Sequence, residues 1–276
     1  MEIFSTIGGN KMNLLKRIIT ALFYIPLLLF IYYVGGNLLF FFLGILCCLG
    51  TYEMFKMNKE QKSVYLLIVN IILSLCLFYC FIISPPWTIA VLFLSLLLNS
   101  GYVIFMNQIQ GAGNWIARSL FSIFYTACGF AMVYKLSETN LFLLLPLIAI
   151  MIWILDSAAF FVGMRLGKHR GVFLCSPKKS LEGFLAGIIA ILICSIALSY
   201  IFPDDYNYSH LIIFTIGIGI FGQFGDLLES ILKREMNVKD SSNTLPGHGG
   251  ILDRFDSLII AAPVVYFLLE LINQCR

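Results

Sequence analysis

The fold of this chain is decided by long apolar stretches such as residues 184–202, which read FLAGIIAILICSIALSYIF. This run contains no charged side chain, and it is long enough to cross the hydrocarbon core of a bilayer as one helix. The whole chain has the same character: of 276 residues, 60% are hydrophobic and only 12% are charged, whereas soluble domains are about one quarter charged. The sequence therefore predicts an all-α, polytopic integral membrane protein.

Nine apolar runs of roughly this kind occur along the chain, separated by turn signals such as Gly35-Gly36 and Pro85-Pro86. They cover residues 18–34, 38–52, 64–83, 87–105, 116–134, 141–162, 184–202, 211–232 and 258–275. The second run is short, which predicts a helix that tilts little or that dips into the membrane and returns. We expect two regions. Residues 1–135 hold about five helices and form a lipid cavity or a dimer contact, and residues 136–276 hold the catalytic site.

Charge is distributed unevenly between the two ends of these spans. Nine alternating spans place the amino terminus and every second connection on one side, and nearly all Lys and Arg residues fall there. The opposite side keeps only Lys135 and Arg276. Because positively charged loops stay in the cytosol, the amino terminus is predicted to be cytosolic. In a bacterium the protein would lie in the inner or plasma membrane.

Three polar patches fall at the cytosolic ends of the predicted helices. They are the stretch that begins at Asp156, the stretch SPKKSLEG at residues 176–183, and the stretch from Asp226 to Asp256. Polar groups are costly near a bilayer and usually have a function there. We expect the three patches to form one site, facing the cytosol, where a soluble phosphate donor meets a lipid head group.

Asp226, Glu229 and Lys233 have helical spacing and share one helix face. An ionised carboxylate in an apolar run needs a cation or a strong hydrogen-bond donor. One explanation is a structural ion pair between Asp226 and Lys233 or Arg254. The other is a metal site, which we favour, with Asp226 and Asp253 as Mg²⁺ ligands, because Mg²⁺ is usually held by one or two carboxylates together with substrate phosphates.

Residues 246–250, PGHGG, contain three glycines in four positions. Such a loop lets backbone N–H groups approach an anion, although a plain turn between two helices explains the glycines as well. His248 could donate to a phosphate, bind a metal ion or satisfy a loop carbonyl. Lys178 and Lys179 precede the seventh span, whose N-terminus can favour an anion, or they are ordinary cytosolic charges.

Two other sequence patterns indicate a structural role and no binding or catalytic site. Gly217-x-Gly219-x-x-Gly222 matches a dinucleotide-binding fingerprint, but it lies inside an apolar run and follows no strand, so close helix packing is expected. The eight cysteines lie mostly in apolar runs and include no CxxC pair. Neither a disulfide framework nor a zinc site is expected.

The motifs of residues 230–256 resemble the signature of the CDP-diacylglycerol synthases (phosphatidate cytidylyltransferases). The matching positions are Ser230, Lys233-Arg234, Lys239-Asp240, Leu245-Pro246, His248-Gly249-Gly250, Asp253-Arg254 and Asp256. Upstream blocks at residues 156–163, 176–183 and 225–230 are similar to other parts of the family. The chain departs from the family at Phe160 and Met164, which leaves the individual roles of Arg165, Lys168 and Arg170 open.

This resemblance implies an enzyme that converts CTP and phosphatidic acid into CDP-diacylglycerol and pyrophosphate. It also implies a homodimer in the lipid bilayer and Mg²⁺, with room for a second cation beside it; no nucleic-acid partner is expected. The expected catalytic residues are Asp226, Asp253, Lys239, Arg254 and Lys233. The expected substrate-binding residues are Lys178, Lys179, Ser180, Arg234, Gly247, His248, Gly249 and Gly250. The expected metal ligands are Asp226 and Asp253, with Asp256, Glu229 and Asp156 as further candidates.

Two other functions are compatible with these residues. The first is a CTP-dependent lipid kinase, or a cytidylyltransferase that acts on an isoprenoid lipid. The second is an ion-coupled transporter that uses Asp156, Asp226 and Glu229 as pathway residues. The clustering of charge on one side and the absence of an evident inverted repeat count against the transporter.

Overall fold

The computed structural model describes residues 24–57, 63–107, 109–242, 244 and 249–274, and these ranges contain helices but no strands. The helices long enough to cross a membrane are α2 (Gly36–Met57), α3 (Val64–Ile83), α4 (Trp87–Phe105), α5 (Ala112–Ser137), α6 (Leu144–Leu166), α7 (Leu181–Ile201) and α10 (Leu252–Gln274), together with the continuous helix Tyr208–Glu235. That helix is made of α8 (Tyr208–Phe214), η1 (Thr215–Gly222) and α9 (Gln223–Glu235).

With the shorter apolar helix Tyr24–Val34, the described part of the chain accounts for all nine expected spans. The prediction of an all-α membrane protein is confirmed. Residues 18–23 of the first expected span lie outside the described residues.

Two expected boundaries are wrong. The second span is a full-length helix of 22 residues, not a short or re-entrant one, because α2 continues through Glu53 and Lys56. The last span begins at Leu252 and not at residue 258, so Asp253 and Asp256 lie in the first turns of α10 rather than in a loop. In both cases the polar end of a helix was excluded because only its apolar part looks like a span.

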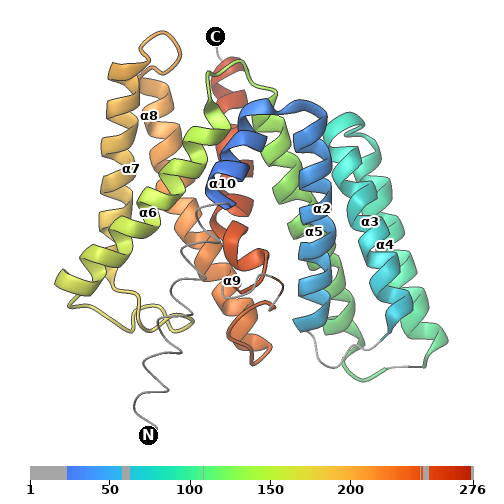
Figure 1. Ribbon diagram of the computed structural model, residues 1–276. Helices are drawn as coiled ribbons and strands as arrows, with labels where there is room; N and C mark the ends of the chain where they lie inside the picture. The colour runs from blue at the N-terminus through green and yellow to red at the C-terminus, as the bar shows by residue number, and fades with distance from the viewer. Residues whose placement is uncertain (1–23, 58–62, 108, 243, 245–248, 275–276) are drawn as a thin grey trace, which may run out of the picture.

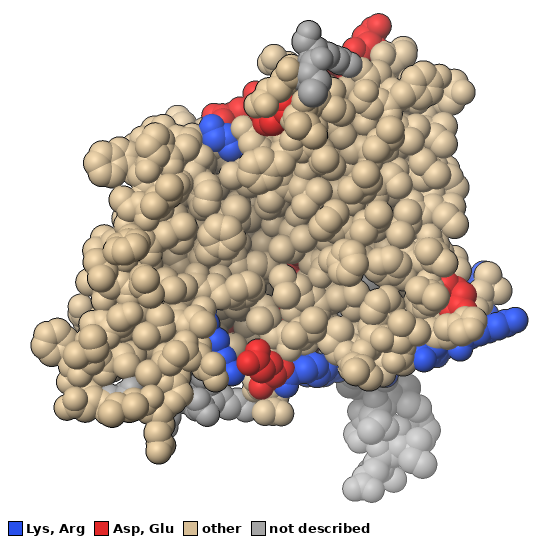
Figure 2. Space-filling model, turned by 180° about the vertical axis from the view of Figure 1, so that it is seen from behind, with Lys and Arg blue, Asp and Glu red and all other residues tan. Residues whose placement is uncertain are grey.

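Successive helices run in opposite directions, so the carboxyl ends of α2, α4, α6 and α9 lie at one end of the molecule (Figure 1). Figure 2 shows charged side chains gathered at the two ends, with a broad, almost uncharged belt between them. The last turn of α9, which carries Lys233, and the segment just before α7, which carries Lys178 and Lys179, lie at one end, whereas the last turn of α5, which carries Lys135, lies at the other. This arrangement is typical of a protein that spans a bilayer.

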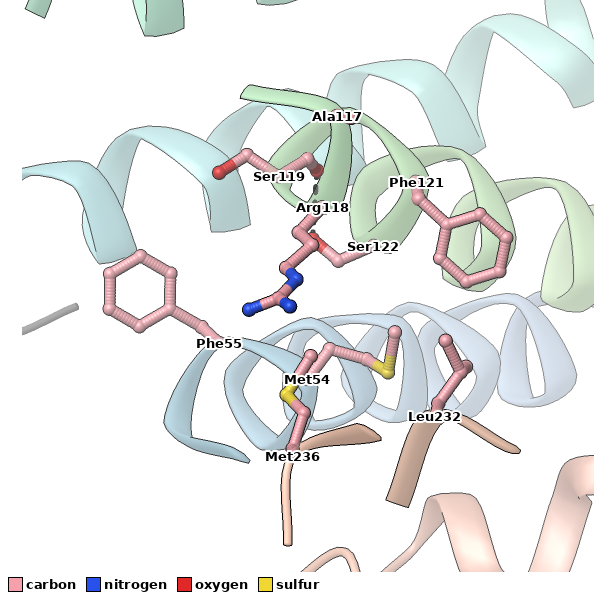
Figure 3. A pocket seen from close by; sticks show the side chains of 9 residues that line it. All are labelled: Met54, Phe55, Ala117, Arg118, Ser119, Phe121, Ser122, Leu232 and Met236. Carbon is pink, nitrogen blue, oxygen red and sulfur yellow. Dashed lines mark hydrogen bonds between the residues drawn. The ribbon is translucent and has the colours of Figure 1, made fainter. Parts of the chain in front are cut away.

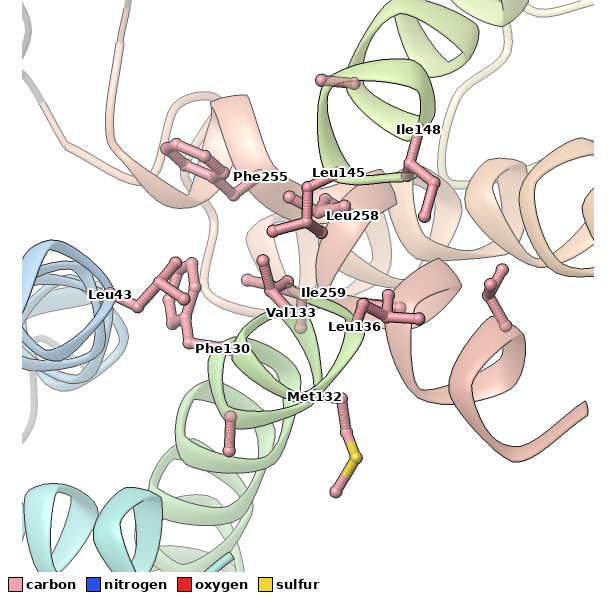
Figure 4. Close-up of a cluster of buried hydrophobic side chains, with 14 of the residues drawn as sticks. Leu43, Phe130, Met132, Val133, Leu136, Leu145, Ile148, Phe255, Leu258 and Ile259 are labelled. Carbon is pink, nitrogen blue, oxygen red and sulfur yellow. The ribbon is translucent and has the colours of Figure 1, made fainter. Parts of the chain in front are cut away.

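The centre of the bundle is formed by α5 and α10, which pack against each other and against α2 and α6 (Figure 4). Phe130 of α5 and Phe255 of α10 meet edge to face, with ring centroids 5.8 Å apart. Next to them Gly129 lies against Ile259, so close that a Cβ at position 129 would overlap the Ile259 side chain. Small residues at such a contact let helix backbones approach closely, which is how helices associate in membranes.

The glycines of the 217–222 pattern lie in η1, a stretch of π-helix. Gly217 is in contact with Val265 of α10, and a Cβ on Gly219 would meet the backbone of Ile188 in α7. The expectation of close helix packing is therefore confirmed. This packing sets the position of α9, which follows η1 directly and carries Asp226.

Candidate active site

A cavity of about 750 Å³ lies at the end of the molecule where α6 and α9 stop and α7 and α10 begin. Five of its lining residues are aspartates and five are Lys or Arg: Asp156, Asp226, Asp240, Asp253 and Asp256, with Arg170, Lys178, Lys179, Lys233 and Arg254. The three polar patches of the sequence therefore meet in one place, as predicted. Apolar residues of α6, among them Phe160 and Met164, form another part of the wall.

Asp226 projects into the cavity from the first turn of α9. One of its oxygens forms an ion pair with Lys179, which approaches from the segment before α7. Asp156 and Asp256 lie close enough to interact electrostatically with Asp226. Lys179 and Arg254 offset part of this negative charge. The ion-pair explanation thus named a wrong partner in Lys233, since Asp226 is paired with Lys179.

Lys233 lies one helical turn beyond Glu229 and is almost buried, with 11% of its side chain exposed. Its ammonium donates to Glu229 Oε2 at 2.8 Å and to Asp253 Oδ1 at 2.6 Å. Glu229 is fully buried, and its Oε1 has no hydrogen-bond partner in the described part of the chain. Burying these charges is tolerable only because each is paired.

Asp253 is held by the loop that precedes α10. Its Oδ2 accepts hydrogen bonds from Ser241 N at 3.0 Å, Ser241 Oγ at 3.0 Å and Gly250 N at 2.8 Å. Gly249 has φ +84°, a conformation that other residues rarely adopt, and a Cβ there would come within 2.8 Å of Asp253 Oδ2. Glycine at position 249 is therefore required by the way the loop wraps around a carboxylate of the protein itself.

Glu53 of α2 also contacts this loop, and sequence reasoning missed it. The carboxylate is fully buried and accepts hydrogen bonds from Ser241, Ser242 and the N–H groups of Ile251 and Leu252, where α10 begins. The available signal was a single acidic residue in an otherwise apolar helix. Such residues are rare in membrane spans and usually mark a functional region.

The segment between α6 and α7 forms one rim of the cavity. Arg170 donates to the carbonyls of Gly163 at 3.1 Å and Met164 at 3.4 Å, and it thereby satisfies the exposed carboxyl end of α6. Ser180 caps α7 by accepting from Gly183 N at 3.1 Å, and it also lines the cavity. Sequence reasoning left the role of Arg170 open, and its contacts now give it a structural role in the wall of the cavity.

Of the remaining residues that were predicted to bind substrate or to act in catalysis, some line the cavity and others do not. Lys178 lines the cavity. Arg234 is exposed and donates to the carbonyls of Cys175 and Val238, which tethers the connecting segments. Lys239 is exposed and is not among the lining residues of the cavity, whereas its neighbour Asp240 is. The predictions for Gly247 and His248 lie outside the described residues.

The opposite face of α9 is apolar. Leu232, together with Met236 just after the helix, lines a smaller cavity of about 190 Å³ between α2 and α5 (Figure 3). Arg118 reaches across it and forms an ion pair with Glu235 at 2.8 Å. The helix is thus amphipathic, and packing of its apolar face turns Asp226 and Lys233 toward the larger cavity.

The donor set suits a metal ion that arrives with a phosphate ligand. Among the described residues, no three His, Cys, Asp or Glu side chains are placed to hold a metal ion by themselves. Mg²⁺, however, is usually held by one or two carboxylates together with substrate phosphates. Among the residues that the structure describes, one oxygen of Asp226 pairs with Lys179, whereas both oxygens of Asp253 already accept from the protein. The contacts therefore fit Mg²⁺ at Asp226 better than at Asp253.

Comparison with known proteins identifies the family. Residues 15–272 match the model of the cytidylyltransferase family. The phosphatidate cytidylyltransferase of Staphylococcus aureus (strain COL) is 32% identical over 94% of this chain and 98% of its own length. That of Staphylococcus haemolyticus (strain JCSC1435) is 33% identical with the same coverage. The phosphatidate cytidylyltransferase of Bacillus subtilis (strain 168) is 47% identical over 45% of this chain and 46% of its own. This integral membrane protein therefore belongs to the cytidylyltransferase family.

Proposed function

We propose that this protein is a phosphatidate cytidylyltransferase, which makes CDP-diacylglycerol and pyrophosphate from CTP and phosphatidic acid. The observation that carries the proposal is the cavity, in a chain of this family. It has paired acidic and basic side chains on α9, α10 and the segment before α7, and an apolar wall on α6. Phosphate groups suit the charged part. The apolar wall suits the acyl region of a lipid.

In the reaction, an oxygen of the phosphatidate phosphate bonds to the α-phosphorus of CTP. The bond between that phosphorus and the bridging oxygen of pyrophosphate breaks, and pyrophosphate leaves with the electron pair. A phosphomonoester has a second pKa of about 6 and is largely dianionic at neutral pH, so a strong general base is not required. Catalysis of this kind depends on positioning and charge neutralisation.

The basic lining residues supply that neutralisation. Lys178, Lys179 and Arg254 line the cavity from two different elements, so they can contact phosphates on two sides. Lys233 lies deeper and keeps its acidic partners in place. We assign Lys239 no direct contact, because it lies outside the lining of the cavity.

Magnesium is the metal that this site would use, with Asp226 as the principal protein ligand and Asp156 and Asp256 nearby. When bound, Mg²⁺ would neutralise the triphosphate and polarise it for attack. Asp253, held by Lys233 and by the loop, would orient α10 and Lys233. Its assignment as a second ligand stays a prediction, as do the second cation and the homodimer.

The active site would face the cytosol. Supporting this orientation, the described Lys and Arg residues other than Lys135 belong to segments at the end that holds the cavity, and the positive-inside rule assigns that end to the cytosol. CTP would then reach the cavity from the aqueous side and the lipid from the side of α6.

The proposal is tested with purified full-length protein, Mg²⁺ and CTP labelled in its cytosine ring. Two acceptors are compared: phosphatidic acid and an isoprenoid phosphate. We expect label to enter the lipid phase with phosphatidic acid, to stop when the metal is chelated, and to be far lower with the isoprenoid. Equal or greater transfer to the isoprenoid would overturn the substrate assignment. Aqueous CDP as the labelled product would show a kinase.

A further inference from the structure

Glu53 is the only acidic residue of α2, and within the described part of the chain its side chain accepts hydrogen bonds from Ser241, Ser242, Ile251 and Leu252. Oε1 accepts from Ser242 Oγ at 2.6 Å and from Ile251 N at 2.9 Å. Oε2 accepts from Ser241 Oγ at 3.0 Å and from Leu252 N at 3.0 Å. The side chain therefore spans from the amino-terminal helices to the loop and the first turn of α10.

A carboxylate with no exposed surface is costly unless donors satisfy it. In the described part of the chain Glu53 has hydroxyl and backbone N–H donors but no ion-pair partner. Two of the donors belong to the N-terminus of α10, where the helix dipole favours negative charge. The loop and helix end are thus built around this carboxylate, which accounts for its burial.

Ser241 connects Glu53 to the catalytic cavity. Its Oγ lies 3.0 Å from Glu53 Oε2 and 3.0 Å from Asp253 Oδ2, so the two carboxylates share one hydroxyl. A hydroxyl has one proton and donates to one of them at a time. Asp253 Oδ1 in turn accepts from Lys233, which also binds Glu229. A continuous chain of polar contacts therefore runs from α2 to α9.

Gly250 shows how closely the parts of this chain fit together. A Cβ at this position would overlap Ser241 Oγ and come within 2.6 Å of Glu53 Oε2. Since Cβ atoms essentially never approach so closely, a side chain there would force the carboxylate or the serine to move. The absence of a side chain at position 250 is therefore coupled to the position of Glu53.

We infer that Glu53 is a positioning residue of the active site: through Ser241 and the first turn of α10, it sets the positions of Asp253 and Lys233. The expected effect on kinetics rests on the proposed function. The expected effect on structure rests on the contacts of Glu53 alone. It gives the amino-terminal helices a part in catalysis.

The structural half is tested first, without substrate, by hydrogen–deuterium exchange of the full-length protein. Glu53→Gln replaces one accepting oxygen by an amide donor, and we expect the amides of Ile251 and Leu252 to exchange at least tenfold faster. Thr51→Val is the matched control, because Thr51 is equally buried on the same helix but bonds to Thr126 and Cys47. Unchanged exchange in Glu53→Gln, or an equal increase in the control, would overturn the inference.

The kinetic half compares kcat, KM for CTP and melting temperature in the same variants. We expect Glu53→Gln to lower kcat/KM by about ten- to a hundredfold at a temperature where it is fully folded, as the loss of hydrogen bonds to a buried charge implies. Glu53→Asp, which keeps the charge, should recover part of the loss. A fall in activity that only follows the folded fraction would show a purely structural role and overturn the inference.

Two further variants keep the test decisive if Glu53→Gln does not fold. Ser242→Ala removes one contact to Glu53, and Ser241→Ala removes the shared hydroxyl. We expect the double variant Glu53→Asp with Ser241→Ala to lose little more than the worse single variant, because both act through one chain of contacts. Fully additive losses would contradict this. A wild-type protein that makes no CDP-diacylglycerol would refute the proposed function but leave the exchange result standing.

Discussion

Asp226 and Asp253 lie in the same cavity but differ in what holds them. In the ranges that the structure describes, Asp226 pairs with Lys179 of a neighbouring segment, and Asp253 accepts from Lys233, Ser241 and Gly250. A carboxylate with few internal partners is available to a ligand, whereas one that is saturated with donors fixes its surroundings. Substitutions of Asp226 and of Asp253 are therefore expected to impair the protein in different ways.

Asp226→Asn should lower turnover by about 10²–10³-fold, because it removes a charge that acts on the reacting phosphates. Its melting temperature should stay near that of the wild type, and more Mg²⁺ should be needed for half-maximal activity. Asp253→Asn should lower both the activity and the melting temperature, since it disrupts the hydrogen bonds that hold the loop before α10. Asp204→Asn, an exposed position at the opposite end, serves as the control. Near-wild-type turnover in Asp226→Asn would contradict the metal assignment.

Lys179→Gln separates phosphate binding from ordinary cytosolic charge. Lys179 pairs with Asp226 in the cavity, whereas Lys168 lies in the same segment and is not among the lining residues. Both changes remove one positive charge from the same side of the membrane. We expect at least a tenfold rise in KM for CTP or fall in kcat for Lys179→Gln, and little change for Lys168→Gln. Equal effects in steady-state assays would mean that only the overall charge matters.

For single residues, the sequence predicted which side chains lie in one site but not which atoms are in contact. Asp226, Lys179 and Arg254 were expected together and do line one cavity. The pairing of Asp226 with Lys179 could not be foreseen, because it depends on the path of the segment before α7. Glu53 was missed because its partners lie 188 to 199 positions away.

Among the helices, α10 has a start that its local sequence does not predict. Its apolar part predicts a span from residue 258, yet the helix begins at Leu252. The first turn is stabilised by Glu53 of α2, which accepts from the N–H groups of Ile251 and Leu252. A helix start that depends on a distant side chain leaves no local signal. Spans of uniform apolar composition, such as α3 and α4, were placed correctly from their sequence.

Gly129→Ala tests the contact between α5 and α10. In most helices this change is stabilising by about 1 kcal/mol, because Ala is the better helix former. Here the new Cβ would overlap Ile259, so we expect a destabilisation of about 1–3 kcal/mol. Gly101→Ala in α4 is the matched control, because a Cβ there meets nothing within 4 Å. Thermal unfolding in detergent measures both, and equal melting temperatures would argue against the close contact.

For the whole molecule, charge and apolar surface together define how the enzyme would work. An almost uncharged belt separates two charged ends (Figure 2), and the larger cavity, the proposed active site, lies at the end that holds most of the described Lys and Arg residues. Its charged part suits a nucleotide from water, and its apolar wall on α6 suits a lipid from the membrane. The family membership supports cytidylyl transfer and argues against the transporter alternative. Composition alone predicted this architecture, because the bilayer fixes helix length and loop charge.

The most direct test of cytidylyl transfer follows the two ends of the triphosphate separately. Purified protein is given phosphatidic acid and Mg²⁺ with CTP labelled either at the α-phosphate or at the γ-phosphate. We predict that the α label enters the lipid phase while the γ label leaves as pyrophosphate, in equal amounts. Transfer of the γ label to lipid, with the α label left in aqueous CDP, would contradict the account and identify a kinase.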